Sequence, residues 1–199
     1  MLVLLSPDLD VQNERKTLIK CFENGLDHYH LRKPYYVKRE FVNYIKEIPS
    51  AYRRRVVVHS QHQLCEEYDL QGIHYQARKR KEERTTVRDE IRKWRSHGKT
   101  VSTSFHSIAE TMDNNDDYHY TFLSPVFDSI SKKNHNGQGF KVVGLKKKMI
   151  ALGGINKDNL HNTKQMGYQG VGILGGVWKD ADPFTAFQDL KRLSEHLFH

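Results

Sequence analysis

The chain has 199 residues, of which 37% are hydrophobic and 11% aromatic, and this composition is too apolar for a disordered protein. The length favours one domain covering 1–199, and two cysteines, Cys21 and Cys65, form neither a disulfide framework nor a C-x-x-C metal motif. The net charge of +8 indicates anionic partners, and phosphate ligands, nucleic acid and a solvated basic surface all satisfy it.

The first ten residues, MLVLLSPDLD, are apolar only at their beginning and carry no basic leader. We therefore expect a buried strand there instead of a signal peptide or a membrane span. Together with the cysteine usage, this predicts a cytoplasmic protein that does not associate with membranes.

Short apolar runs then alternate with amphipathic stretches along the whole chain. The expected strands are Leu2–Ser6, His28–Arg32, Arg55–Ser60, Gly72–Gln76, Thr100–Phe105, Tyr120–Phe127, Met149–Gly153 and Gly170–Leu174. The expected helices are Glu14–Asn24, Val37–Ile48, Gln63–Tyr68, Val87–His97, Ile108–Asn114, Lys157–Met166 and Pro183–Leu197. This order is typical of a parallel sheet covered by helices.

Eight strands in this order close most simply as one compact (β/α)8 TIM barrel, with an open doubly wound sheet as the structural alternative. Only Phe140–Lys148 is available for the sixth helix, so that helix is expected to be short or incomplete. The basic run Arg78–Arg84 has no interleaved aromatic residues, and a solvated loop is a better interpretation of it than an RNA-binding surface.

Polar residues lie where the expected strands end, which is where barrels carry their chemistry. They are His30, Arg32, Lys33, His59, Ser60, His74, Gln76, Ser104, His106, Ser129, Ser131, Lys132 and Lys133. The glycine pairs Gly153-Gly154 and Gly175-Gly176 follow the last two strands, where exposed backbone N–H groups commonly hold phosphate. Relief of crowding at a strand end is the alternative role for such glycines.

Six segments at the strand ends follow, in order, those of the thiamine phosphate synthase/TenI family, which the chain resembles over nearly its whole length. These segments are His30–Lys33, Gly72–His74, Ser104–Ser107, Ser124–Lys132, Ala151–Ile155 and Gly170–Leu174. The resemblance implies a transferase of thiamine biosynthesis that joins an aminopyrimidine diphosphate to a thiazole phosphate and releases pyrophosphate. These two phosphorylated molecules are then the expected partners; nucleic acid is not expected, and a homodimer is left open.

The resemblance also implies roles for individual residues. Arg32 and Lys132 would contact phosphate oxygens, and with His30 they are the expected catalytic residues. Ser129 and Ser131 stand near the thiazole, and the two glycine pairs bind its phosphate. The remaining expected substrate-binding residues are Lys33, His59, Ser60, His74 and Ser104.

The chain departs from the family pattern at three places. His30 replaces an amide of the synthases and is shared with TenI proteins, whereas Pro125 stands where the TenI isomerase has its catalytic histidine. The family's Mg²⁺ ligands correspond to Ser60 and Lys79, which supply no carboxylate, so no metal ligand is expected at either position. A thiazole phosphate isomerase and a non-catalytic binder of thiamine phosphates are therefore the alternatives to a synthase.

Overall fold

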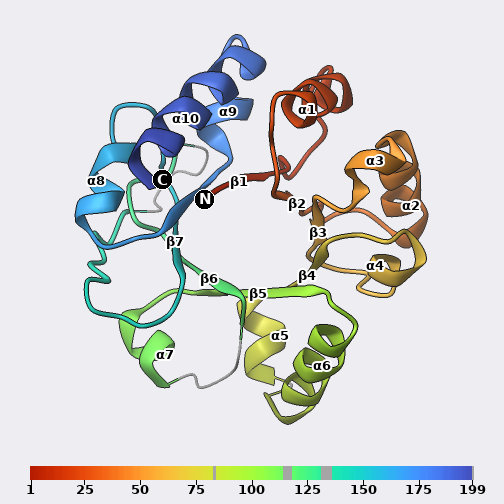
Figure 1. The fold of residues 1–199 in the computed structure, drawn as a ribbon, viewed down its shortest axis with the longest axis horizontal. Coiled ribbons are helices and arrows are strands. Elements are labelled where there is room, and N and C mark those ends of the chain that lie inside the picture. Colours follow the sequence, from red (N-terminus) through yellow and green to blue (C-terminus); the bar gives the residue numbers. More distant parts are fainter. Residues whose placement is uncertain (83, 114–117, 131–135, 199) are drawn as a thin grey trace.

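The computed structural model describes residues 1–82, 84–113, 118–130 and 136–198. Eight parallel strands close into one barrel in chain order, each pairing with the next and β8 pairing with β1 (Figure 1). They are β1 Leu2–Leu5, β2 Tyr29–Leu31, β3 Val56–Val58, β4 Gly72–Tyr75, β5 Thr100–Phe105, β6 Tyr120–Leu123, β7 Met149–Leu152 and β8 Gly170–Ile173. The prediction of a (β/α)8 barrel is confirmed, and the open sheet is excluded.

Helices surround the strands in Figure 1. They are α1 Glu14–Glu23, α2 Lys38–Glu47, α3 Ser50–Arg53, α4 Leu64–Glu67, α5 Ala77–Glu82, α6 Arg84–Ser96, α7 Ile108–Asp113, α8 Leu160–Gln165, α9 Gly175–Trp178 and α10 Pro183–Phe198. Among the described residues, none of these helices is both long and apolar enough to cross a membrane.

The segments after β4 and β6 differ from what the sequence predicts. The solvated loop expected over Arg78–Arg84 is wrong, because α5 occupies Ala77–Glu82 and the Arg80 side chain is buried. Its guanidinium lies 4.2 Å from the Phe105 ring centroid, so an arginine takes the place of an apolar residue on this helix. The sixth helix, expected to be short or incomplete, is absent from described residues 136–148.

The barrel separates two apolar cores. Alternate residues of each strand point outward and pack against the helices, as Leu4, Tyr29 and Val58 do. The residues that point inward form a smaller cluster inside the barrel, made of Val3, Leu5, Tyr120, Phe122 and Ile150. This interior is therefore filled with side chains and is not a channel.

Contacts at the ends of elements hold the site-bearing loops in place. The Trp178 ring nitrogen donates a hydrogen bond of 2.7 Å to the Leu5 carbonyl, which fixes α9 against the end of β1. Asp182 caps α10, where its carboxylate accepts hydrogen bonds from the backbone amides of Phe184 (3.1 Å) and Thr185 (3.3 Å).

Candidate functional site

The carboxyl ends of the strands bring most of the predicted site residues to one mouth of the barrel. His30 and His74 lie on β2 and β4, Ser104 lies on β5, and Arg32 and His59 directly follow β2 and β3. The glycine pairs follow β7 and β8, although Gly175 and Gly176 also form the first turn of α9. Ser131, Lys132 and Lys133 lie outside the described residues, and the predictions about them remain predictions.

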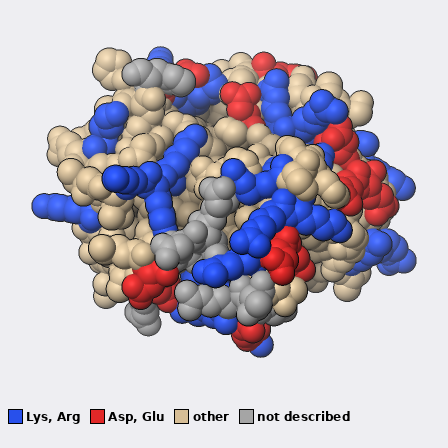
Figure 2. Space-filling model, turned by 60° about the horizontal axis from the view of Figure 1, so that its bottom comes forward, with Lys and Arg blue, Asp and Glu red and all other residues tan. Residues whose placement is uncertain are grey.

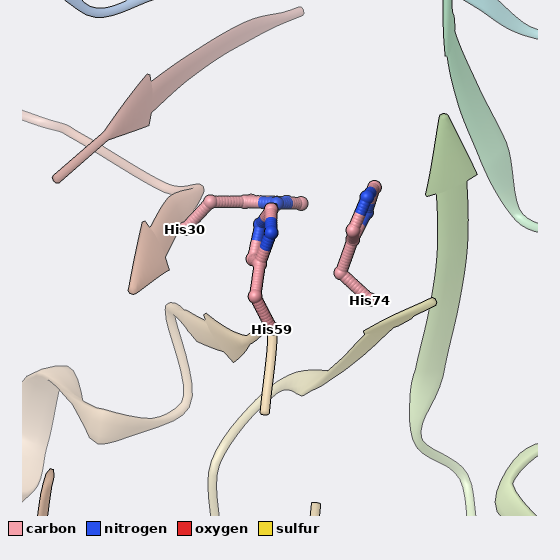
Figure 3. A group of neighbouring side chains, drawn as sticks. All are labelled: His30, His59 and His74. Carbon is pink, nitrogen blue, oxygen red and sulfur yellow. The ribbon is translucent and has the colours of Figure 1, made fainter. Parts of the chain in front are cut away.

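His30, His59 and His74 form a histidine cluster inside the mouth, with one ring nitrogen of each within 4.8 Å of the others (Figure 3). His30 Nδ1 and His59 Nε2 share a hydrogen bond of 2.9 Å, and the rings of His59 and His74 stack with their centroids 4.0 Å apart. All three side chains are buried. They converge because β2, β3 and β4 are neighbours that pair in parallel, and each histidine is on an inward-pointing position.

Hydroxyl groups hold two of these rings from the far side. The Tyr120 hydroxyl lies 2.6 Å from His30 Nε2, and Ser102 Oγ lies 2.9 Å from His74 Nδ1. Ser104 Oγ is 3.0 Å from the other ring nitrogen of His74. Sequence reasoning found Ser104 but missed Ser102 and Tyr120, although the alternation of Ser102 and Ser104 on one strand already placed both on one face.

Burial keeps the histidine cluster uncharged. It lowers the pKa of His74 to about 3, with His62 and Arg32 adding smaller repulsions. Burial also holds the pKa values of His30 and His59 well below their usual range, and the neighbouring imidazoles contribute in the same direction. At neutral pH all three rings therefore offer lone pairs and N–H donors without carrying charge.

Arg32 is a cationic side chain at this mouth. Its Nη1 forms an ion pair with Asp8, from the loop after β1, and both side chains are about one third exposed. Ser6 fixes the backbone of Arg32 by donating to its carbonyl and accepting from its amide, both at 2.7 Å. Among the described residues, no other hydrogen bond of this guanidinium is recorded, so its remaining N–H groups can meet an anion.

Lys33 lies away from the other predicted site residues. Its ammonium is fully buried and contacts Glu14 at 2.8 Å and Asp10 at 2.9 Å. The Tyr44 hydroxyl donates to the other Glu14 oxygen at 2.6 Å, so α1, α2 and the β2 loop share one buried polar network. These contacts hold Lys33 in a buried polar network, and its expected role in substrate binding stays a prediction.

A cavity of about 460 Å³ opens beside the histidine cluster and is lined by His59, Ser60, Gln61, His62, Gln63, Gln76, Arg78, Lys79 and Glu82. Lys79 Nζ lies 3.9 Å from a Glu90 oxygen and 5.5 Å from the Tyr75 ring centroid. Among the described residues of this lining, Glu82 is the one carboxylate, and it is paired with Arg78 at 2.8 Å. A hydroxyl, amides and cations are a poor donor set for Mg²⁺, which prefers carboxylate oxygens, so these residues do not fit that ion.

The glycines after β7 bring three loops together. Gly153 and Gly154 have φ values of 102° and 68°, and a Cβ at Gly154 would lie 2.2 Å from the Asp128 carbonyl oxygen. A Cβ at Gly176 would lie 2.5 Å from the Ile155 carbonyl oxygen, so the loop after β7 also touches α9. Ser129 belongs to the neighbouring loop and is half-buried. This close packing supports a crowding role for the glycines, and the same backbone can carry phosphate-binding amides.

The surface charge is dispersed. In Figure 2, lysine and arginine side chains spread across the face and alternate with acidic ones at several places. Pairs such as Arg78–Glu82 and Arg92–Asp89 account for some of this mixture.

Comparisons with known proteins identify a family. A family model described as thiamine monophosphate synthase matches residues 2–177. The thiamine-phosphate synthase of Prochlorococcus marinus is 31% identical over 105 residues, which cover 50% of this chain and 30% of that relative. The match thus spans less than a third of the relative's length.

Solved structures match over the full barrel. A thiamine phosphate pyrophosphorylase from Bacteroides thetaiotaomicron has a TM-score of 0.73 and 27% identity, covering 100% of this chain and 99% of that one. A thiamine phosphate pyrophosphorylase from Pyrococcus furiosus has a TM-score of 0.78 and 18% identity, covering 100% and 96%. The 3-hexulose-6-phosphate synthase of Salmonella typhimurium has a TM-score of 0.72 at 16% identity and covers 100% of both chains. The last two, at such low identity, share the fold alone.

Proposed function

The chain belongs to the thiamine monophosphate synthase family, and we propose that it joins an aminopyrimidine diphosphate to a thiazole phosphate and releases pyrophosphate. The observation that carries this proposal is the convergence of Arg32, His74, Ser104 and the glycine loops at the mouth of one closed barrel. Each lies at the carboxyl end of a strand, where barrel enzymes act on phosphorylated substrates.

Stabilisation of the leaving group would be the main task of the site. As the carbon–oxygen bond to the diphosphate breaks, the thiazole supplies the electron pair for a new bond to the same carbon. The electron pair of the broken bond goes to the pyrophosphate, and negative charge accumulates on its oxygens. Arg32 would bind these oxygens with the N–H groups that Asp8 does not use, and Lys132 would add a second charge. Ser104 would donate its hydroxyl to the same group, oriented by His74 at 3.0 Å.

The other substrate would bind on the opposite side of the mouth. The backbone around Gly153, Gly154, Gly175 and Gly176 would hold the thiazole phosphate through N–H groups, and Ser129 and Ser131 would contact the thiazole. His59 and Ser60 line the adjoining cavity and would contact the aminopyrimidine. His30, fully buried and hydrogen-bonded to His59, would orient that ring and not contact the diphosphate itself.

Magnesium has no step in this proposal, because Ser60 and Lys79 do not supply its ligands. The positive charge would come from Arg32, Lys79 and Lys132 instead. We therefore expect synthesis to depend little on added Mg²⁺ and to persist with a chelator.

A non-catalytic binder of thiamine phosphates is the second candidate. It is favoured by one observation: an ammonium group, Lys79, stands where the family has a metal-binding carboxylate. A binder would keep affinity for thiazole phosphate and for pyrophosphate but would form no product.

The test is formation of thiamine phosphate from the two substrates, followed by chromatography, with added Mg²⁺ and with EDTA. We expect product in both conditions, and a loss of about tenfold or more in kcat/KM for Arg32→Gln and for Ser104→Ala. Arg54→Gln is the matched control, because this exposed arginine pairs with Asp69 away from the mouth. Thiazole phosphate binding without product in either condition would replace the synthase by the binder.

A further inference from the structure

We propose that the histidine cluster, His30, His59 and His74, is a three-imidazole binding site for a late first-row divalent cation of the zinc class. The site lies inside the barrel, below the cavity lined by Ser60 and Lys79. Its ligands differ from the Mg²⁺ positions of the family, Ser60 and Lys79, although His59 lines the same cavity as these two residues. The proposal does not depend on the proposed reaction.

The positions of the ring nitrogens suit a shared ion. Three strands in a row each supply one imidazole, and Figure 3 shows the rings of His30 and His59 meeting while His74 faces them from the adjacent strand. Two nitrogens bound to one tetrahedral zinc at about 2.0–2.1 Å lie about 3.3 Å apart. His30 Nδ1 and His59 Nε2 are now 2.9 Å apart, so they need to separate by only a few tenths of an ångström.

The far nitrogens of His30 and His74 already have the partners that metal-bound histidines usually have. His30 would ligate through Nδ1 while its Nε2 stays hydrogen-bonded to the Tyr120 hydroxyl at 2.6 Å. His74 would ligate through Nε2 while its Nδ1 stays with Ser102 Oγ at 2.9 Å. Such partners fix the tautomer and the direction of each lone pair, and they commonly contribute to metal affinity.

The protons of the cluster can accommodate the ion. One proton now lies in the hydrogen bond between His30 and His59, and it must leave the two facing nitrogens when both bind metal. Each of these rings can move its proton to its own far nitrogen, since neutral imidazole carries one proton on either side. Binding at neutral pH should therefore release no protons to the buffer.

The donor set selects the class of metal. Three imidazoles without a carboxylate suit zinc, cobalt, nickel or copper, whereas Mg²⁺ and Ca²⁺ require oxygen ligands. Three protein ligands leave a fourth position open, as in catalytic zinc sites. Ser104 Oγ lies 3.0 Å from His74 Nε2 and would border that position, while His59 opens to the cavity through which an ion can enter.

The first test uses the full chain, stripped with a chelator and freed of it by gel filtration. Co²⁺ is titrated while visible absorption is recorded, and Zn²⁺ is then added as a competitor. We expect one equivalent of Co²⁺ to give the intense bands of a four- or five-coordinate ion, which one equivalent of Zn²⁺ abolishes. Zn²⁺ calorimetry in two buffers of different ionisation enthalpy should give the same heat.

The variant His59→Gln should weaken binding by about a hundredfold or more, because one of three ligands is lost. His28→Gln is the matched control: His28 is a half-buried histidine just before β2, hydrogen-bonded to Gln71 and outside the cluster. It should bind Co²⁺ as the native protein does. Circular dichroism checks that both variants are folded.

A second measurement needs no variant. In ¹⁵N-labelled native protein, long-range proton–nitrogen spectra should show three imidazoles changing shift together on addition of one equivalent of Zn²⁺. A native protein that gives no Co²⁺ bands and no stoichiometric Zn²⁺ binding would overturn the proposal. So would equal binding by His59→Gln, because the chain has 12 histidines and surface ones can bind zinc adventitiously.

Discussion

Asp8 neutralises Arg32 at the mouth of the barrel, where the loop after β1 meets the end of β2. A carboxylate in this place opposes anion binding, because it is close enough to repel the same phosphate that the guanidinium attracts. It also prevents the arginine from lying unpaired in a half-buried position. If Arg32 binds phosphate as proposed, Asp8 would set the strength of that binding as well as the position of the guanidinium.

We expect Asp8→Asn to bind pyrophosphate about fivefold more tightly than the native protein, which corresponds to about 1 kcal/mol for a partly exposed pair. Isothermal titration at low and high salt measures this, and the difference should shrink as salt rises. Asp27→Asn is the control, because it changes the net charge by the same amount as Asp8→Asn. Asp27 lies at the other end of the barrel, near Arg55. Weaker binding by Asp8→Asn would instead give Asp8 an orienting role.

The buried network around Lys33 leads to a prediction about stability. Lys33→Met would leave the Glu14 carboxylate buried without its nearest cation, and we expect the free energy of unfolding to fall by about 3 kcal/mol or more. Urea unfolding of Lys33→Met/Glu14→Gln should recover much of that loss, because the uncompensated charge is gone. Lys38→Met, at an exposed position, should change stability by less than about 0.5 kcal/mol. If Lys33→Met were as stable as the native protein but bound substrate more weakly, Lys33 would be a substrate-binding residue.

Alanine substitutions at two glycines with similar φ values can distinguish the effect of backbone strain on stability from the effect of steric crowding. Gly98 and Gly154 have φ values of 70° and 68°, but a Cβ at Gly98 meets nothing within 4 Å. Gly98→Ala should therefore cost about 1 kcal/mol through backbone strain alone, whereas Gly154→Ala should cost more, because it also displaces the loop at Asp128. Urea unfolding measures both, and thiazole phosphate titration should show weakened binding in Gly154→Ala only. An equal decrease in the free energy of unfolding for both variants would mean that the loop at Asp128 moves aside for the added methyl group without a further loss of stability.

The low pKa values of the histidine cluster predict a pH dependence for the metal-free protein. A histidine with a pKa lowered in the folded state binds fewer protons there than in the unfolded chain, so its contribution to stability is complete above about pH 6.5 and is lost as pH falls. Each neutral ring should then reduce the free energy of unfolding by about 1.4 kcal/mol per pH unit below that point. Urea unfolding between pH 7.5 and 4.5 measures how steeply the free energy of unfolding falls as the pH falls. In His74→Gln this slope should be smaller by the contribution of one ring, about 1.4 kcal/mol per pH unit. An unchanged slope in this variant would mean that His74 is already protonated in the fold or unperturbed.

Much of the barrel could be predicted from sequence because the strands are short apolar runs between breakers. Helix α5 could not, because its sequence ARKRKE has no apolar periodicity and its buried position is filled by Arg80. The burial of the Lys33 ammonium against α1 has a local cause as well. His30 and Arg32 share a side of the chain, and the next residue turns to the other side, toward α1.

The members of the candidate site were predictable individually, but their contacts were not. Each histidine stands at an expected strand end, yet the cluster depends on the register between strands, such as Val57 with Gly72 and His30 with Val57. Tyr120 was missed for a related reason, since its hydroxyl reaches His30 across the barrel from the first residue of β6. Distances of this kind are set by closure of the barrel and not by any local pattern.

Gly172 limits which amino-acid substitutions the interior of this barrel can accept. A Cβ there would lie 2.9 Å from Phe122 Cε1 and 3.1 Å from Leu152 Cδ1, so Phe122 occupies volume that β8 leaves empty. Because Phe122 also packs edge-on against the His30 ring, 5.1 Å between centroids, enlarging residue 172 would push on the histidine cluster through it. Substitutions at positions 122 and 172 are therefore coupled: a larger residue on one strand requires a smaller residue on the other. A substitution at only one of the two positions would disturb the packing of the imidazoles.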